Sequence, residues 1–264
     1  MSHRRIALGI RYDGSAYYGW QRQDSDLPTV QSKLEMGLAR VANHPIVATC
    51  AGRTDTGVHA TSQVVHFDTE ANRSDYSWQF GANSNLPPDI SVTWAKEVPH
   101  DFHARFSATS RKYRYVIYNH EVKPGILRQA VGWHHRPLDE NKMQMAAQSL
   151  LGEHDFSAFR GAACQSQSAS RCVEEISIWR QRRLVIFEIK ANAFLLHMVR
   201  NILGSLVEVG AGLKPVEWIK DLLYSKDRSQ AGVTIAPNGL YLVAVDYPEH
   251  FQIPSNPIGP FFLP

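Results

Sequence analysis

Residues 46–67 decide the fold of this chain, and their sequence is IVATCAGRTDTGVHATSQVVHF. The apolar runs at 46–50 and 64–67 have the length and β-branched content of strands. The loop of residues 51–60 between them contains two glycines, which interrupt a strand pattern and permit a tight backbone. The stretch therefore predicts two strands joined by a structured loop, and that loop carries one carboxylate, Asp55.

The flanking segments complete a β-α-β-β-α-β order. Residues 6–12 alternate as a strand, and apolar positions recur at helical spacing over residues 30–41, after a plausible helix start at Thr29. Residues 74–80 predict a short helix, and residues 90–96 predict a strand.

The second part of the chain repeats this order, with one additional helix. Its predicted strands are residues 111–118, 173–179, 184–190 and 240–246, and its predicted helices are residues 138–151, 194–209 and 216–223. Two such halves predict a mixed α+β fold of two ferredoxin-like units, each an antiparallel sheet backed by helices. We expect an N-terminal half of residues 1–102 and a C-terminal half of residues 103–264.

Composition excludes several classes of protein. The hydrophobic share of 44% and the charged share of 20% are ordinary for a soluble globular protein. No apolar run approaches the roughly 18 residues that span a bilayer. The three cysteines, Cys50, Cys164 and Cys172, form no C-x-x-C pair, and the histidines show no zinc-binding spacing. We therefore expect a cytoplasmic protein without a structural metal.

The net charge of +3 does not by itself indicate a nucleic-acid partner, but the cations are unevenly distributed. One group is interleaved with aromatic residues, and a second lies at a predicted hairpin. They are Arg105, Arg111, Lys112 and Arg114, and then Arg180, Arg182 and Arg183. Clustered cations with rings between them suit a polyanion whose bases can stack, and a solvated charged face is the alternative.

Residues 52–57, GRTDTG, are the segment that remains as a candidate for chemistry. The chain lacks the phosphate-binding loop, the dinucleotide-binding turn and the nucleophile elbow of common enzymes. Asp55 either acts on a substrate, with Arg53 near it or in a nucleic-acid groove, or caps its own backbone in an Asx-turn. The spacing alone leaves both interpretations open.

Two further residues carry a similar choice. Arg200 lies on the predicted helix at 194–209, and a buried guanidinium there needs a carboxylate partner. Asp55 and Glu208 are candidates, and a surface position is the third alternative. Tyr113 alternates with apolar neighbours on a predicted strand, which favours core packing, yet a cation stands on either side of it.

Ordered motifs across almost the whole chain resemble the TruA family of tRNA pseudouridine synthases. They are GWQRQ at 19–23, AGRTDTGVH at 51–59, FHARFSA at 102–108, YRY at 113–115, NAF at 192–194, HMVRN at 197–201 and GLYL at 239–242. The chain departs from the family pattern at Thr56, where an alanine is expected. The substitution is small and leaves Asp55 in place.

The resemblance implies a reaction and an assembly. The reaction would isomerise uridine to pseudouridine at positions 38, 39 and 40 of the tRNA anticodon stem-loop, without a metal or an organic cofactor. The two α/β halves would join their sheets around a central catalytic cleft. The protein would be a homodimer in which each tRNA touches both subunits.

The resemblance also implies roles for particular residues. Asp55 would be the catalytic carboxylate, and Arg53 would occupy or brace the space left by a flipped-out nucleotide. Arg200 would pair with the aspartate and keep it ionised. Tyr113 would stack near the uracil and take part in the loss of the C5 proton, while Leu240 would line the pocket and exclude water.

The tRNA contacts implied by the resemblance lie in three segments. They are Phe102, His103, Ala104, Arg105 and Phe106, then Arg73, and then the polar loop of Gln165, Ser166 and Gln167. The first segment alternates rings and basic groups, as a stacking and phosphate-binding surface does. The competing hypothesis is a catalytically silent tRNA-binding or chaperone protein on the same scaffold, which loss of the aspartate, tyrosine or arginine would favour.

Overall fold

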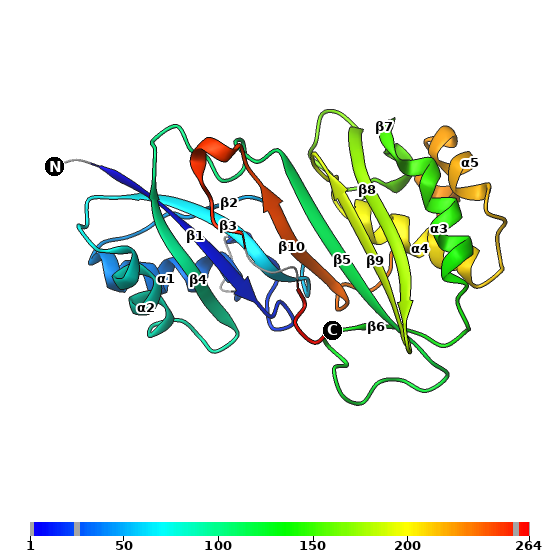
Figure 1. Ribbon diagram of the computed structural model, residues 1–264, viewed down its shortest axis with the longest axis horizontal. Helices are drawn as coiled ribbons and strands as arrows, with labels where there is room; N and C mark the ends of the chain where they lie inside the picture. Colours follow the sequence, from blue (N-terminus) through cyan, green and yellow to red (C-terminus); the bar gives the residue numbers. More distant parts are fainter. Residues whose placement is uncertain (1–2, 24–26, 256–258, 264) are drawn as a thin grey trace. The chain divides into compact units, whose positions relative to one another are not determined.

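The computed structural model describes residues 3–23, 27–255 and 259–263, and it confirms the mixed α+β class. The chain divides into two compact units. The first unit contains residues 1–111 and 241–264, and the second contains residues 112–240. Each unit has its own strands and helices (Figure 1).

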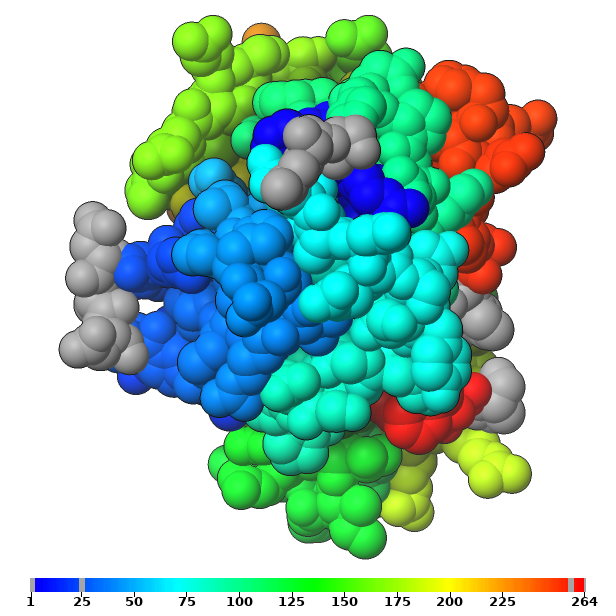
Figure 2. Space-filling model, turned by 90° about the vertical axis from the view of Figure 1, so that its left-hand side faces the viewer, coloured from blue at the N-terminus to red at the C-terminus, as the bar shows by residue number. Residues whose placement is uncertain are grey.

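The first unit follows the predicted β-α-β-β-α-β order. Its elements are β1 (Arg4–Tyr12), α1 (Val30–Ala42), β2 (Thr49–Cys50), β3 (His59–Thr69), α2 (Asp75–Asn83), β4 (Ile90–Val98), most of β10 (Leu240–Asp246) and the 3-10 turn η4 (Glu249–Phe251). α1 begins at the predicted position because Thr29 and Ser32 form a capping box. α2 packs against α1 and β4, and Figure 2 shows this part of the chain, in blue to cyan, as a solvent-facing surface.

The strands of the first unit pair in the order β4-β1-β3, and β2 and β10 both pair with β3. β1 is antiparallel to β3 and β4, with Leu8 opposite Val65 on one side and Ala95 on the other. β2 is also antiparallel to β3, whereas β10 is parallel to it at Tyr241 and Leu242. The antiparallel part is compatible with the predicted ferredoxin-like half.

The C-terminal segment belongs to the first unit, which differs from the predicted division at residues 102 and 103. Phe102 and Phe251 are both buried in one core cluster, against which Val245 and Tyr247 pack. β10 therefore returns the chain to the core of the first unit. Sequence order alone does not contain this long-range pairing.

The second unit contains most of β5 (Ser110–Asn119), whose first two residues belong to the first unit. Its other elements are β6 (Gly132–His134), α3 (Glu140–Ala147), η1 (Gln148–Leu150), β7 (Gly152–Asp155), η2 (Ser157–Phe159), β8 (Ser170–Gln181), β9 (Leu184–Ala191), α4 (Met198–Gly210), α5 (Trp218–Ser225) and η3 (Arg228–Gln230). The strand order is β5-β9-β8-β7, and β6 pairs with β5. α3 packs against β8, α4 and α5 (Figure 1).

Two details of the second unit differ from the prediction. The short strands β6 and β7 have no clear apolar alternation and were not predicted. α4 begins at Met198 and not at residue 194, because its N-cap His197 adopts a left-handed φ of 59°. Residues 193–197 therefore precede the helix, and Phe194 lies outside it.

Candidate active site

The loop between β2 and β3 is closed by its own backbone. The N–H of Val58 donates to the carbonyl of Asp55 at 3.1 Å, and Gly57 adopts a left-handed φ of 77°. Asp55 is partly buried, whereas Arg53 is exposed. The loop thus presents an arginine to solvent beside a partly enclosed carboxylate.

Thr54, between this arginine and this aspartate, is held from two sides. Its buried hydroxyl shares a hydrogen bond of 2.7 Å with the hydroxyl of Tyr12, and its carbonyl accepts from the N–H of Trp20 at 3.0 Å. Gly19 has a φ of 84°, and a Cβ at this position would lie 2.8 Å from the Thr54 carbonyl oxygen. Only glycine permits this approach without strain, so the GWQRQ motif fixes the loop between β2 and β3.

Two buried polar side chains that sequence reasoning missed hold the start of the loop. Gln63 on β3 donates to the carbonyl of Gly52 at 2.6 Å and accepts from its N–H at 3.3 Å. Arg111 donates to the carbonyl of Ala51 through two nitrogens, at 3.0 and 3.3 Å. The sequence signal for Gln63 is a polar residue inside an apolar strand. The sequence places Arg111 only in a group of neighbouring cations and gives no sign of this contact.

Tyr113 and Leu240 belong to the second unit, where they are only 8% and 4% exposed. The ring of Tyr113 meets that of Phe194 edge-on, with centroids 5.1 Å apart and an interplanar angle of 87°. The side chain of Asn192 accepts from the N–H of Cys172 at 3.1 Å, which anchors the NAF turn to β8. This motif therefore supplies one wall of the Tyr113 environment.

Arg200 lies near the start of α4 and is partly buried. Its Nε donates to the carbonyl of Ile235 at 2.8 Å, so one side of the guanidinium has a fixed acceptor. Asp55 lies in the first unit and Arg200 in the second. The pairing of these two side chains accordingly stays a prediction.

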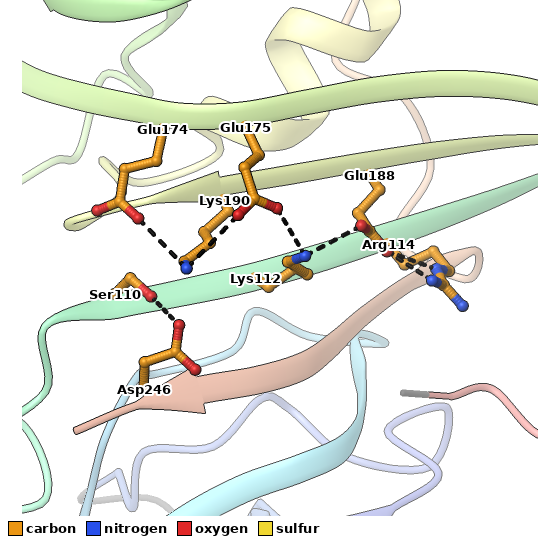
Figure 3. Close-up of polar contacts among 8 residues, drawn as sticks. All are labelled: Ser110, Lys112, Arg114, Glu174, Glu175, Glu188, Lys190 and Asp246. Atoms are coloured by element: carbon orange, nitrogen blue, oxygen red, sulfur yellow. Dashed lines mark hydrogen bonds and ion pairs between the residues drawn. The ribbon is translucent and has the colours of Figure 1, made fainter. Parts of the chain in front are cut away.

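The cations on either side of Tyr113 are engaged within the second unit. Figure 3 shows them directed toward acidic residues of β8 and β9. Lys112 Nζ lies 2.8 Å from Glu175 and 3.2 Å from Glu188, and Arg114 pairs with the same Glu188. These cations stabilise the sheet, which corrects their interpretation as part of a polyanion surface or of a solvated face.

The comparisons with known proteins agree with one another. A family model described as tRNA pseudouridine synthase matches residues 9–107 and 146–248. The tRNA pseudouridine synthase A of Coxiella burnetii is 63% identical over 260 residues, which cover 98% of this chain and 99% of that protein. The synthases of the same name from Shewanella woodyi and Klebsiella pneumoniae are 59% and 58% identical over 259 residues, which cover 98% of this chain and 99% and 96% of those proteins.

The chain belongs to the tRNA pseudouridine synthase family. This membership confirms the resemblance drawn from the motifs and the class of enzyme that it implies, an isomerase of tRNA uridine. The positions modified in tRNA and the roles of individual residues stay predictions.

The predicted RNA-stacking segment of this synthase contains two buried residues. Phe102 and Ala104 are both 0% exposed. The ring of Phe102 packs 5.1 Å from that of Tyr247 and 5.2 Å from that of Phe251. Because their side chains are enclosed by the core of the first unit, neither can stack on a base, which corrects that part of the prediction.

His103, Arg105 and Phe106 form the other half of the same turn. Nδ1 of His103 accepts the backbone N–H groups of Arg105 and Phe106, at 3.1 and 3.2 Å. Burial lowers the pKa of His103, which favours the neutral ring that can accept these bonds. Phe106 is 75% exposed, and the guanidinium of Arg105 lies 5.5 Å from its ring centroid. An exposed ring beside a cation suits the stacking of a nucleic-acid base.

The remaining predicted tRNA contacts lie on the surface of each unit. Arg73 is exposed, and its Nε donates to the last turn of α1 at 3.2 Å. Gln165 and Gln167 are exposed on a loop of the second unit, whereas Ser166 is partly buried and its carbonyl accepts from Arg160 at 2.7 Å. The loop is thus shaped by an arginine beneath it and presents two amides to solvent.

Two observations concern metals and membranes. Over residues 3–23, 27–255 and 259–263, no three histidine, cysteine, aspartate or glutamate side chains gather as ligands for a metal ion. In the same part of the chain, no helix combines the length and the apolar character needed to cross a membrane.

Proposed function

We propose that this synthase converts uridine to pseudouridine at positions 38, 39 and 40 of the tRNA anticodon stem-loop, with Asp55 as its catalytic carboxylate. The observation that carries the proposal is the loop between β2 and β3. Tyr12, Trp20 and Gln63 all support the residues around a partly buried aspartate there. A loop fixed in this way holds the backbone that carries the carboxylate in one position before a substrate binds.

The reaction requires a nucleotide that has left the helix stack. A uridine in a stem is stacked and paired, so the enzyme must flip it into a pocket. The N1–C1′ bond then breaks, the uracil turns, and C5 bonds to C1′. The C5 proton is lost and N1 gains a proton, so the product is an isomer of the substrate. We assign Arg53, which is exposed, to occupy or brace the space that the flipped nucleotide leaves.

Asp55 serves this reaction in one of three ways: it attacks C1′, it attacks C6, or it acts as a base on a glycal-like path. Arg200 is assigned as the cation that keeps the carboxylate ionised in a dry pocket. Tyr113 is assigned to stack near the uracil and to take part in C5 deprotonation. Leu240, which is buried, is assigned to exclude water from the intermediate.

Binding of tRNA is assigned to exposed and partly buried groups on both units. In the first unit they are Arg73, His103, Arg105 and Phe106, and in the second they are Gln165, Ser166 and Gln167. The stacking surface at Phe106 is the strongest of these assignments, because the ring is exposed and has a cation beside it. We infer that the protein acts in the cytoplasm as a homodimer, without metal or cofactor.

Pseudouridine mapping on an unmodified tRNA transcript tests the proposal directly. Asp55→Ala should abolish turnover, while tRNA affinity stays within a few fold because phosphate contacts supply most of the binding energy. Thr56→Ala is a matched control, because Thr56 is exposed in the same loop and carries no assigned role. This control should retain wild-type turnover.

Each other outcome has a defined meaning. Appreciable pseudouridine formation by Asp55→Ala would remove the catalytic assignment. Pseudouridine outside the anticodon stem-loop would redirect the substrate assignment to another region of tRNA. Tight tRNA binding without pseudouridine from the wild-type protein would favour the silent binding or chaperone protein.

A further inference from the structure

Residues 231–239 connect η3 to β10 within the second unit and run along α4. Residues 232–236 belong to no helix or strand. A Cβ on Gly204 of α4 would lie 1.9 Å from the carbonyl oxygen of Val233, so the two backbones are in direct contact. The position of this segment therefore depends on its individual contacts with α4 and not on a regular hydrogen-bond ladder.

Arg200 is bonded to this segment through both its backbone and its side chain. Its Nε donates to the carbonyl of Ile235 at 2.8 Å, and the N–H of Ile235 is directed to the carbonyl of Arg200 at 3.4 Å. A guanidinium is planar, so an acceptor fixed at Nε sets the direction in which its other nitrogens point. The carbonyl of Ile235 is thus one contact that orients Arg200.

The neighbouring residue Thr234 is held by a buried polar network. Its hydroxyl donates to Oδ1 of Asn201 at 2.6 Å, and Asn201 is 0% exposed. Nδ2 of Asn201 donates to the carbonyl of Phe159 at 2.8 Å, which fixes the orientation of the amide. Arg228 donates to Oδ1 of Asn201 at 3.1 Å and to the Thr234 hydroxyl at 3.0 Å.

The same segment is also attached to β5, which carries Tyr113. The hydroxyl of Tyr115 donates to the carbonyl of Ala236 at 2.9 Å, and the N–H of Val116 donates to the carbonyl of Gly239 at 2.9 Å. Leu240 follows immediately in the chain. Residues 231–239 therefore connect three residues assigned to the reaction: an arginine, a tyrosine and a leucine from three different elements.

We propose that Thr234 is a positioning residue for Arg200: its hydroxyl, bonded to Asn201 and Arg228, fixes the Ile235 carbonyl that orients the Arg200 guanidinium. The inference rests on the proposed role of Arg200 in the reaction. Thr234 touches no reacting atom in this scheme. It acts only through the direction of one guanidinium.

Single-turnover pseudouridine formation with excess enzyme tests the inference. Thr234→Val removes the hydroxyl and keeps the shape, and it should slow the rate constant about 10- to 100-fold, the effect of a displacement near 1 Å. The affinity for tRNA should change less than about twofold, because phosphate contacts dominate it. Thr234→Ser, which keeps the hydroxyl, should restore the rate to within about threefold.

A double-mutant cycle separates positioning from a general loss of stability. Arg200→Lys keeps the charge but lacks the Nε donor, so the Ile235 carbonyl has no guanidinium left to orient. Adding Thr234→Val to Arg200→Lys should therefore cause little further loss, whereas independent effects would multiply. Circular dichroism at the assay temperature measures the folded fraction of each variant. If Thr234→Val does not fold, Arg228→Met provides the same test.

Three results would overturn the inference: a wild-type rate for Thr234→Val, equal losses for the valine and serine variants, or multiplying losses in the cycle. None of them affects the proposed function, provided that the wild-type protein is active and Asp55→Ala is not. A wild-type protein that forms no pseudouridine would instead overturn the proposed function itself.

Discussion

Gly19 is the single residue whose replacement most directly tests the support of the loop that carries Asp55. Its φ of 84° costs a residue with a side chain about 1–2 kcal/mol. Its Cβ would also lie 2.8 Å from the carbonyl of Thr54, next to Asp55. We expect Gly19→Ala to lower the free energy of unfolding by about 2–5 kcal/mol, the sum of backbone strain and overpacking, and to slow pseudouridine formation.

Gly212 provides the matched control for this variant. Its φ is 73°, and a Cβ there would meet nothing within 4 Å. Gly212→Ala should lose only about 1–2 kcal/mol and retain the wild-type rate. Urea denaturation and single-turnover kinetics measure both variants. Equal losses of stability, or an unchanged rate in Gly19→Ala, would contradict steric support of the loop by Gly19.

Residue-scale prediction from the sequence was selective for a physical reason. Asp55 and Arg53 are candidates because a glycine-containing loop between two strands carries them and because the motif around them resembles that of the family, and their roles stay predictions. Gln63 and Arg111 were missed because each bonds to backbone groups of the loop, and backbone acceptors leave no mark on the sequence. The burial of Phe102 was missed because its packing partners lie in the C-terminal segment.

At the scale of an element, the turn at residues 103–107 is held by a histidine. The stability of the protein should therefore depend on pH through this turn. Nδ1 of the buried His66 accepts the N–H of Ala104 at 3.1 Å, so this bond needs a neutral ring. Burial lowers the pKa of His66 to about 4. In the unfolded chain this histidine has an ordinary pKa near 6.5. Between about pH 6.5 and pH 4 the unfolded chain therefore binds a proton that the folded chain does not bind. This stabilisation is complete above about pH 6.5 and is lost as the pH falls toward 4.

His66→Asn tests this dependence, because an amide oxygen can accept the same N–H and does not titrate. The free energy of unfolding from urea denaturation, measured at several values between about pH 7 and pH 5, should fall less steeply for the variant than for the wild type. The comparison is between the slopes of the free energy of unfolding against pH. A constant difference in stability between the two proteins does not affect it. Parallel slopes would show that His66 is not the group responsible.

Elements were predicted well where one amphipathic pattern determines them. α1 begins after Thr29 as expected, because its cap and its apolar spacing agree. α4 begins later than expected, because the apolar spacing continues through residues 194–197 while the backbone turns at His197. β6 and β7 escaped prediction because they are short edge segments, positioned by their neighbours and not by their own periodicity.

At the scale of the whole molecule, the sequence indicated the α+β class but not the division of the chain. The order of elements is local information and can be read from periodicity. The return of residues 241–264 to the first unit depends on the parallel pairing of β10 with β3, which joins distant parts of the sequence. Family membership, by contrast, was already visible in the motifs, because they extend over nearly the full length.

The binding of tRNA should show which of the clustered cations face the ligand. Association with a polyanion weakens as salt rises, and each phosphate contact contributes about 0.7–0.9 to the slope of log affinity against log salt. Arg105 is exposed beside Phe106, whereas Lys112 is paired with Glu175 and Glu188. Arg105→Ala should therefore reduce the slope by about 1, and Lys112→Met should leave it unchanged.

Filter binding or fluorescence anisotropy over a salt series, with an unmodified tRNA transcript, provides both slopes. The two variants each remove one positive charge. A difference between their salt slopes therefore reports where the charge lies relative to the tRNA and not a change in net charge. A flat salt dependence of the wild type would contradict phosphate-driven binding altogether. Equal reductions in both variants would mean that Lys112 leaves its glutamates when tRNA binds. In that case the two glutamates would face the tRNA without Lys112 as a partner. Glu188→Gln, which removes one of these negative charges, should then strengthen the binding of tRNA, so this variant tests the internal pairing of the cations directly.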